Sequence, residues 1–332
     1  MTSTVSHVEV QTQADGSLLV SWEIEGEPSA VDVATGPSPD HVDHLHQTTA
    51  PAGCTSLRLP GPSPSRPYVS VGPSGGGPAV VAADRRIPFE GITNFRDLGG
   101  YRTASGTRLR WGQVFRADAL HGLTAADLAL YRRLGLRSVY DLRGDTEREE
   151  RPNPVQSRQH TIIGRPPGPE PSGPTATGDS AADGERFLGD LYIGLIDHAA
   201  AQIGQLYSWL VSDGGLPAVF HCHAGKDRTG IVAALLLEAL GVERGAVLDD
   251  YELTSRYRLR AHQESTFERL LESGMSPEAA AGVLTTPRWA MEAALHHLDE
   301  RYGGIGPYLT GPARMRPEVI DALRERLLEP RP

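Results

Sequence analysis

The pattern of apolar and polar positions along the chain changes character near residue 87. In residues 1–86, short stretches of alternating apolar and polar residues are separated by clusters of Gly, Pro, Asp and Ser. Such alternation is typical of strands that bury one face, and it predicts a small all-β sandwich. The segment that carries His41, His44 and His46 is predicted to be a loop. The predicted strands are His7–Thr12, Ser17–Glu23, Ala30–Thr35, Ser56–Leu59, Tyr68–Val71 and Ala79–Ala82.

From Phe89 onwards the pattern is that of an α/β domain. Most apolar residues recur at helical spacing, and a short strand is predicted at Ser138–Leu142. Residues 164–184 are rich in Pro, Gly, Ser and Thr, which predicts a flexible insertion. The predicted helices are Ala125–Leu134, Glu185–His198, Ala199–Ser212, Thr229–Leu240, Arg244–Thr254, Arg258–Ser273, Pro277–Leu284, Arg288–Tyr302 and Pro317–Leu328.

Length and composition limit the class of protein. A chain of 332 residues with 39% hydrophobic content is long enough for two folded domains. The net charge of −10 argues against general nucleic-acid binding, and an anionic substrate would have to be attracted by a local basic patch. The N-terminal residues are polar, and no apolar run reaches membrane-spanning length. We therefore expect a cytoplasmic protein, with export without a classical signal as the alternative.

The most informative segment is His221-Cys222-His223-Ala224-Gly225-Lys226-Asp227-Arg228-Thr229-Gly230. It lies between an apolar run and a predicted helix, and it places an arginine six positions after a cysteine. Loop amides and a helix N-terminus bind anions and lower the pKa of a thiol, while an arginine matches two phosphate oxygens. Lys226 is the only lysine of the chain. This crowding of cations around a cysteine predicts a phosphate-binding loop with a nucleophile, rather than a buried cysteine in an ordinary turn.

This loop resembles the signature loop of the cysteine-dependent protein tyrosine phosphatases. The chain is most similar to the bacterial tyrosine and lipid phosphatases typified by the secreted triple-specificity enzyme of mycobacteria. The segments Thr93–Tyr101, Val114–Leu120 and Val139–Arg143, the last followed by Glu147 and Pro152, also resemble that family. The resemblance implies an α/β fold with a tyrosine phosphatase-like central sheet flanked by helices over residues 87–332. Trp22 resembles the core tryptophan of fibronectin type III domains, which implies such a domain over residues 1–86.

The resemblance also implies roles for residues of the loop. Cys222 would be the nucleophile that forms a phosphocysteine, and Arg228 would bind the phosphoryl group. No Trp-Pro-Asp sequence is present to supply a separate general acid, so Asp227 is the first candidate and Asp141 the second. An ion pair with a neighbouring arginine is the alternative for Asp141. The predicted phosphate-binding residues are His223, Ala224, Gly225, Lys226, Asp227, Arg228 and Thr229.

Two further expectations concern substrate breadth and access. In the resembled family a lysine at the position of Lys226 accompanies activity on phosphoinositides as well as phosphotyrosine, so we expect dual specificity, although the lysine could simply hold a neighbouring strand end. The helices within residues 256–286 could form a lid over the site or could be ordinary core. No metal or cofactor is expected.

The sequence leaves three functions open. The first is a phosphatase that hydrolyses phosphate monoesters of tyrosine, and also of serine, threonine or phosphoinositides, through a phosphocysteine. The second is a phosphatase of a small phosphorylated metabolite, and the third is a non-catalytic protein that binds phosphorylated ligands. The expected partner is a phosphorylated protein, lipid or small molecule, without nucleic acid and without a membrane span. The N-terminal domain is expected to contact other proteins.

Overall fold

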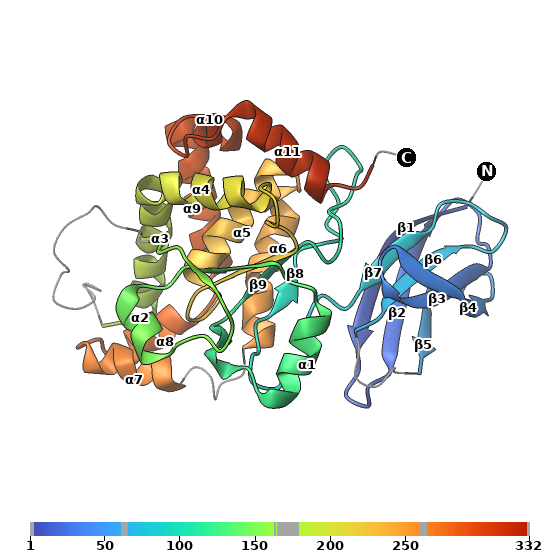
Figure 1. Ribbon diagram of the computed structural model, residues 1–332, viewed down its shortest axis with the longest axis horizontal. Helices are drawn as coiled ribbons and strands as arrows, with labels where there is room; N and C mark the ends of the chain where they lie inside the picture. Colours follow the sequence, from blue (N-terminus) through green and yellow to red (C-terminus); the bar gives the residue numbers. More distant parts are fainter. Residues whose placement is uncertain (1–2, 61–65, 163, 165–178, 259–263, 331–332) are drawn as a thin grey trace. The chain divides into compact units, whose positions relative to one another are not determined.

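A computed structural model describes residues 3–60, 66–162, 164, 179–258 and 264–330 (Figure 1). The chain forms two compact units. Residues 1–88 with 97–100 make up the first, and residues 89–96 with 101–332 make up the second. Residues 97–100 belong to the first unit although they follow residue 87, where the sequence pattern changes.

The first unit consists of two antiparallel sheets. Three strands form one sheet in the order β1-β2-β5, and four form the other in the order β4-β3-β6-β7. Alternate side chains of β2 are buried, namely Leu18, Val20 and Trp22, as its apolar pattern predicts. The strands are β1 (Thr4–Thr12), β2 (Leu18–Glu25), β3 (Val31–Ser38), β4 (His41–Ala50), β5 (Ser56–Leu59), β6 (Tyr68–Pro73) and β7 (Val80–Ala83).

The prediction of a loop at His41–His46 was wrong, because this segment is part of β4. It pairs with β3, and the register shifts between Val33 and Thr35 and again between Thr35 and Ser38. These irregularities break the simple alternation on which strand prediction depends. Gly36 also allows an unusually close approach, since a Cβ atom there would lie 2.0 Å from the carbonyl oxygen of His41.

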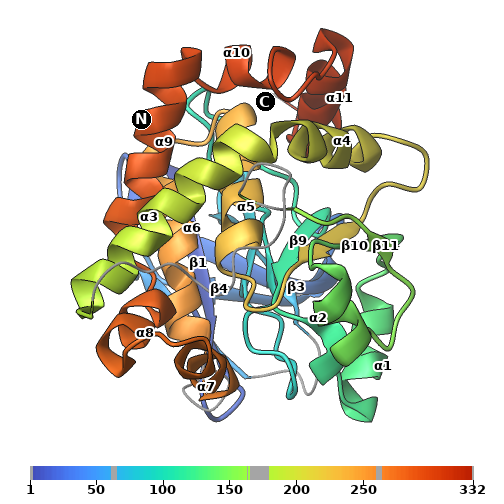
Figure 2. The same ribbon diagram turned by 90° about the vertical axis from the view of Figure 1, so that its left-hand side faces the viewer.

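The second unit is an α/β domain built on a five-stranded sheet in the order β11-β10-β12-β9-β8. The neighbours from β11 to β9 run parallel, and Figures 1 and 2 show helices on both faces of this sheet. The central strand β12 is buried along its whole length, as expected when both faces are covered. Its strands are β8 (Arg96–Asp97), β9 (Val114–Ala117), β10 (Ser138–Asp141), β11 (Arg158–Gln159) and β12 (Ala218–His221).

The predicted helices are present, with small differences at their ends. Thr124 caps α1 in a reciprocal capping box with Asp127. The short helices α2 and α10 were not predicted. The helices are a 3-10 turn at Leu120–Gly122, α1 (Ala125–Arg133), α2 (Asp145–Glu150), α3 (Ala181–His198), α4 (Ala200–Leu210), α5 (Asp227–Ala239), α6 (Arg244–Tyr257), α7 (Glu264–Glu272), α8 (Pro277–Leu284), α9 (Arg288–Tyr302), α10 (Ile305–Thr310) and α11 (Pro317–Leu327).

Two glycines let α3 and α8 pack backbone against backbone. A Cβ atom on Gly184 of α3 would lie 2.0 Å from the carbonyl oxygen of Ala279, and one on Gly282 of α8 would lie 2.1 Å from that of Ala181. Only glycine fits such an approach at either position. Figure 2 shows α8 beside the first turns of α3, with α7 next to it. The cluster between α7 and α8 is apolar and contains Met275, Ala279, Ala280, Phe267, Leu270, Leu271 and Val283.

Two predicted segments fall partly outside the described residues. Residues 165–178 of the proposed flexible insertion are among those not described, while Ala181–Gly184 form the first turn of α3 and are therefore helical. Residues 259–263 of the proposed lid also lie outside. Arg258 has an extended backbone instead of the predicted helical one, and the described part of the predicted helix is α7 (Glu264–Glu272). Within the described part of the chain, no helix is both long and apolar enough to cross a membrane.

Candidate active site

The cysteine loop joins the central strand of the sheet to a helix. The strand β12 ends at His221 and α5 begins at Asp227, so Cys222–Lys226 form the connecting turn. β12 lies between β10 and β9 and is parallel to both. In such sheets the crevice at the carboxyl ends of the strands is where ligands bind. Cys222 is 1% exposed at this edge.

Gly225 gives the loop its shape. Its φ of +66° is in the left-handed region, and a Cβ atom would lie 2.5 Å from the carbonyl oxygen of Ala117 on β9. The Asn94 side chain donates to the carbonyls of Ala224 at 3.0 Å and Gly225 at 3.3 Å. Arg116 donates to the Gly225 carbonyl at 2.8 Å. These contacts occupy the carbonyl groups of the loop, so the N–H groups of its peptides are left to bind an anion.

A buried charged cluster supports these contacts. Asp250 of α6 pairs with Arg116 at 2.6 Å and with Arg96 at 3.1 Å, and all three side chains are at most 1% exposed. Tyr101 donates to Asp250 at 3.0 Å, and Arg96 donates to Asn94. Burial, together with the charge of Arg96, lowers the pKa of Arg116 to about 10 in spite of the nearby carboxylate. In the segment Asn94-Phe95-Arg96, selected for its resemblance, Asn94 therefore holds the loop directly and Arg96 holds it through Asn94.

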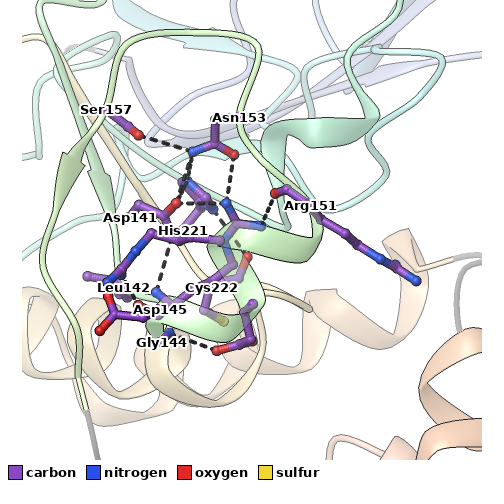
Figure 3. A network of polar contacts seen from close by, with 12 residues as sticks. Asp141, Leu142, Gly144, Asp145, Arg151, Asn153, Ser157, His221 and Cys222 are labelled. Atoms are coloured by element: carbon purple, nitrogen blue, oxygen red, sulfur yellow. Dashed lines mark hydrogen bonds and ion pairs between the residues drawn. The ribbon is translucent and has the colours of Figure 1, made fainter.

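A second buried group fixes the residue before the cysteine (Figure 3). Arg143 donates to Asn153 Oδ1 at 3.1 Å, and Asn153 Nδ2 donates to Asp141 Oδ2 at 3.1 Å. These two contacts set the orientation of the Asn153 amide, so its Nδ2 also faces His221 Nε2, at 3.0 Å. Nε2 must then accept, and the ring proton is on Nδ1, which lies 3.2 Å from the Cys222 carbonyl oxygen. Burial lowers the pKa of His221 to about 4, in keeping with a neutral ring.

Asp141 is part of this group and is 1% exposed. Arg143 binds both of its carboxylate oxygens, at 2.9 Å and 2.7 Å, and also donates its backbone N–H to it. The pKa of Asp141 is lowered, because the hydrogen bonds and the charge of Arg143 outweigh its burial. The structure therefore gives Asp141 the ion pair that was the alternative to an acid role.

Arg228 is held by Glu147 of α2 in a two-point ion pair. Nη1 lies 2.6 Å from Oε2 and Nη2 lies 2.7 Å from Oε1. Although Glu147 is largely buried, these contacts lower its pKa to about 2, and they also raise that of Arg228. A guanidinium has five N–H groups. Glu147 accepts hydrogen bonds from two of them, one on each Nη, and the Leu142 carbonyl, 3.5 Å from Nη1, accepts a third. The Nε proton and the second proton of Nη2 therefore have no hydrogen-bond acceptor among the described residues. These two protons form a fork that matches two phosphate oxygens.

Asp227 is bound on one oxygen only. The Tyr192 hydroxyl of α3 lies 2.7 Å from Asp227 Oδ1, and Lys226 Nζ lies 3.3 Å from the same atom. Tyr192 also contacts the Tyr251 hydroxyl of α6 at 2.8 Å. No described residue hydrogen-bonds to Asp227 Oδ2. The side chain of Asp227 is 25% exposed.

Lys226 is buried, with 2% of its surface exposed. Its ammonium group donates to the carbonyls of Val283 and of Thr285, the latter at 2.9 Å, which end α8. Together with Asp227 these give it three acceptors, which is the number of its protons. Burial lowers its pKa, opposed by Asp227. The alternative partner considered for it, the end of the Asp141 strand, is not the one found.

The remaining predicted residues lie in or beside the loop. The ring of His223 contacts Arg269 of α7 at 2.7 Å, and burial, followed by the charge of Arg269, lowers its pKa to about 3. Ala224 contributes a carbonyl to Asn94. Thr229 is fully buried on α5, and its hydroxyl has no partner among the described residues.

Sequence reasoning missed several residues of the site. Asn153, Tyr192 and Arg258 were not singled out, and Glu147 was noted without a partner. Arg258 follows α6, is 8% exposed, and feels the charges of Asp118, Asp227 and Cys222. A polar side chain in an otherwise apolar helical stripe, as Tyr192 is in α3, was the one available signal. No cluster of ligating side chains suited to a metal ion occurs among the residues that the structure describes.

Comparison with known proteins agrees with this geometry. The family model of the tyrosine phosphatase family matches residues 87–329. The chain belongs to the tyrosine phosphatase family and is a phosphoric monoester hydrolase.

Two of the relatives match more than two thirds of the chain. A Cupriavidus necator protein, provisionally named a tyrosine-protein phosphatase, is 30% identical over 70% of this chain and 86% of its own length. The triple specificity protein phosphatase PtpB of Mycobacterium tuberculosis is 31% identical over 68% of this chain and 93% of its own length. A tyrosine-protein phosphatase of Nostoc commune is 32% identical over 37% of this chain and 43% of its own length.

Proposed function

We propose that the chain hydrolyses phosphotyrosine and related phosphate monoesters through a phosphocysteine at Cys222. The observation that carries this is the arrangement of Arg228 on α5, six residues after Cys222. Glu147 of α2 holds its guanidinium, and two of its N–H donors have no acceptor among the described residues. Phosphoryl transfer depends on such positioned donors, because the transferring oxygens carry the charge.

The proposed reaction has two steps. Cys222 attacks phosphorus as a thiolate, the bond from phosphorus to the ester oxygen breaks, and Asp227 gives its proton to that oxygen. Water then attacks the phosphocysteine, Asp227 accepts a proton from this water, and the sulfur–phosphorus bond breaks to release phosphate. Asp227 is favoured over Asp141 as the acid because it is partly exposed and has an unbound oxygen, whereas both oxygens of Asp141 are bound by Arg143.

An aryl phosphate assay tests the mechanism. In the Cys222→Ser variant, phosphate release should be abolished, while the substrate should still bind. Asp227→Asn should lower kcat/KM for esters with poor leaving groups by about 100-fold or more, within the range of general acid catalysis. Asp141→Asn is the comparison, but it also disturbs a buried ion pair, so its folded fraction has to be measured in parallel. If Asp227→Asn retains the wild-type rate at every pH, Asp227 is not the acid.

We also propose activity on phosphoserine, phosphothreonine and phosphoinositides. The similarity to a triple specificity phosphatase favours it. Lys226 would act through its charge, because its three protons are already bound to acceptors. Phosphate release from a phosphotyrosine peptide, a phosphoserine peptide, phosphatidylinositol 3-phosphate and a small sugar phosphate should be compared. Release from the sugar phosphate alone would favour the metabolite phosphatase instead.

We propose that α7 and α8 shield the site. Arg269 of α7 contacts His223, and Lys226 donates to the carbonyls at the end of α8. Both helices therefore contact the loop. Such cover would protect a thiolate from oxidation. Arg269→Ala should speed inactivation of Cys222 by peroxide, whereas Glu268→Ala, an exposed neighbour on α7, should not. Equal inactivation rates in both variants would argue against a shield. A reducing cytoplasm suits this chemistry, and both cysteines are free.

We infer that the first unit is a fibronectin type III-like domain that contacts other proteins. Its two antiparallel sheets, of three and four strands, and the buried Trp22 on β2 support this. Asp97 pairs with Arg66 of this unit at 3.0 Å, so we expect a fragment of residues 1–100 to unfold cooperatively and one of residues 1–88 to be less stable. Urea unfolding of the two fragments tests this, and equal stability would limit the domain to residue 88.

A further inference from the structure

We propose that Tyr192 is a positioning residue for Asp227, which selects the carboxyl oxygen that carries the catalytic proton. This rests on the proposed role of Asp227 as the general acid. Tyr192 lies on α3, 35 residues before Asp227, and no motif of the sequence connects the two.

The direction of the hydrogen bonds from Tyr251 through Tyr192 to Asp227 follows from the number of protons that each group has. Tyr192 has one hydroxyl proton, and Asp227 Oδ1, 2.7 Å away, can only accept when the carboxyl is ionised. Tyr192 therefore donates to Asp227, and Tyr251 at 2.8 Å donates to Tyr192. Burial raises the pKa of Tyr192 well above its ordinary value, so Tyr192 keeps this proton throughout the assay range.

The consequence concerns the protonated form of Asp227. Tyr192 and Lys226 both donate to Oδ1, so a proton added there would have to displace a donor. The proton is therefore placed on Oδ2, which no described residue binds. A carboxylic acid must hold its proton on the atom nearest the leaving oxygen to act as a general acid. Tyr192 thus lowers the number of unproductive arrangements of Asp227.

Other charged groups surround this carboxyl and were considered. Arg258 after α6 and Arg228 on α5 both feel the charge of Asp227, as does Tyr251 on α6. None of the three has a hydrogen bond to it among the described residues. The hydroxyl of Tyr192 and the ammonium of Lys226 are the direct donors, and Lys226 also holds α8. Tyr192→Phe is therefore the cleaner change.

The test compares kcat/KM of Tyr192→Phe and the wild-type protein for aryl phosphates of graded leaving-group pKa. We expect a loss of about 10-fold for the poorest leaving groups, a fraction of the full effect of a general acid, and little loss for the best. The Tyr192 hydroxyl donates to the ionised carboxyl, and this donor is lost in the variant. The basic limb of the pH–rate profile should move to higher pH.

Tyr207→Phe is the matched control. Tyr207 is also fully buried, and its hydroxyl donates to the Val232 carbonyl of α5 at 2.6 Å rather than to Asp227. A uniform loss for all esters in Tyr192→Phe, equal to that in Tyr207→Phe, would mean that Tyr192 only supports the fold and would overturn the proposal.

The outcomes separate this proposal from the proposed function. If Asp227→Asn steepens the leaving-group dependence and Tyr192→Phe does not, the positioning role is overturned while the acid role stands. If Asp227→Asn has no effect, the acid role fails first. Should Tyr192→Phe not fold, Tyr251→Phe carries the test, since it removes the donor to Tyr192. We expect a smaller change in the same direction, and an unchanged leaving-group dependence and pH profile would overturn the proposal.

Discussion

The cysteine loop has two sides that differ in burial and in hydrogen bonding. On the buried side, Asp141, Arg143 and His221 are at most 1% exposed, and each is bound by the others or by Asn153. On the exposed side, Asp227 and Arg228 keep 25% and 23% of their side chains exposed. Each of these two also keeps polar atoms without a described partner. The buried side fixes the backbone, while the exposed side retains the groups that chemistry requires.

This difference explains why polar residues of the same kind have separate roles. A buried acid whose oxygens are all bound stays ionised and rigid, as Asp141 does. Asp227 shares one oxygen and leaves the other for a ligand. The comparison predicts that changes on the exposed side reduce activity with little loss of stability, and that changes on the buried side do the reverse.

The largest effect is expected for Arg228→Lys on the exposed side. A lysine cannot present two parallel donors, so kcat/KM should fall by about 100- to 1,000-fold, as when a donor to developing charge is lost. Arg244→Lys is a matched control, because Arg244 also makes an ion pair with two acids, Glu238 and Asp299, but lies outside the loop. Wild-type kcat/KM in the Arg228→Lys variant would contradict the role of the fork.

Asp250→Asn tests the buried charged cluster of Asp250, Arg96 and Arg116, which also supports the loop. It leaves Arg96 and Arg116 without their carboxylate, and losing one partner of a buried ion pair costs about 3–5 kcal/mol of unfolding free energy. Urea unfolding measures this cost. The neighbouring Asp249→Asn, in which a 68% exposed carboxylate that pairs with Arg288 is removed, should cost less than about 1 kcal/mol. Equal costs would show that the cluster does not stabilise the loop.

His221 predicts a pH dependence of the stability of the buried side. Its pKa is about 4 in the folded protein and 6.5 as the ordinary value. As the pH falls below 6.5, the unfolded chain binds a proton that the folded chain does not bind until about 4, so the free energy of unfolding decreases across this window. The loss should be on the order of 3 kcal/mol.

Urea unfolding across this pH window checks the prediction, and His221→Gln should flatten the curve. Glu147 adds a loss at lower pH, because its pKa falls from 4.5 to about 2 on folding. An unchanged slope in the variant would mean that another group, such as His223, dominates.

The smallest effect is expected for Glu147→Gln. The neutral amide keeps the shape but loses the two-point ion pair, so Arg228 is held less firmly. We expect kcat/KM to fall by about 10-fold, or about 1.4 kcal/mol. Glu149→Gln, on the same helix and without a contact to Arg228, should have no effect. A loss as large as that of Arg228→Lys would mean that Glu147 does more than hold the arginine.

The sequence predicted the elements better than their contacts. The loop, its strand and its helix follow from local patterns, because apolar periodicity and capping are encoded nearby. Strand β4 was missed because its register with β3 is irregular, and α10 because it is only six residues long. Asn153 and Tyr192 were missed for another reason. They reach the loop from segments 68 and 35 residues away from their partners, and only the packing of the sheet and helices brings them together.

The backbone contact between α3 and α8 limits how the region around the site can move. Gly184 and Gly282 each receive a carbonyl of the other helix, and a displacement of one helix by one turn, about 5.4 Å, would bring side chains into those carbonyls. Sliding and axial rotation of α8 are therefore blocked. If α7 and α8 shield Cys222 as proposed, an opening that preserves this packing would move α7 about the residues between Glu272 and Pro277, while α8 and the Lys226 contact stay in place.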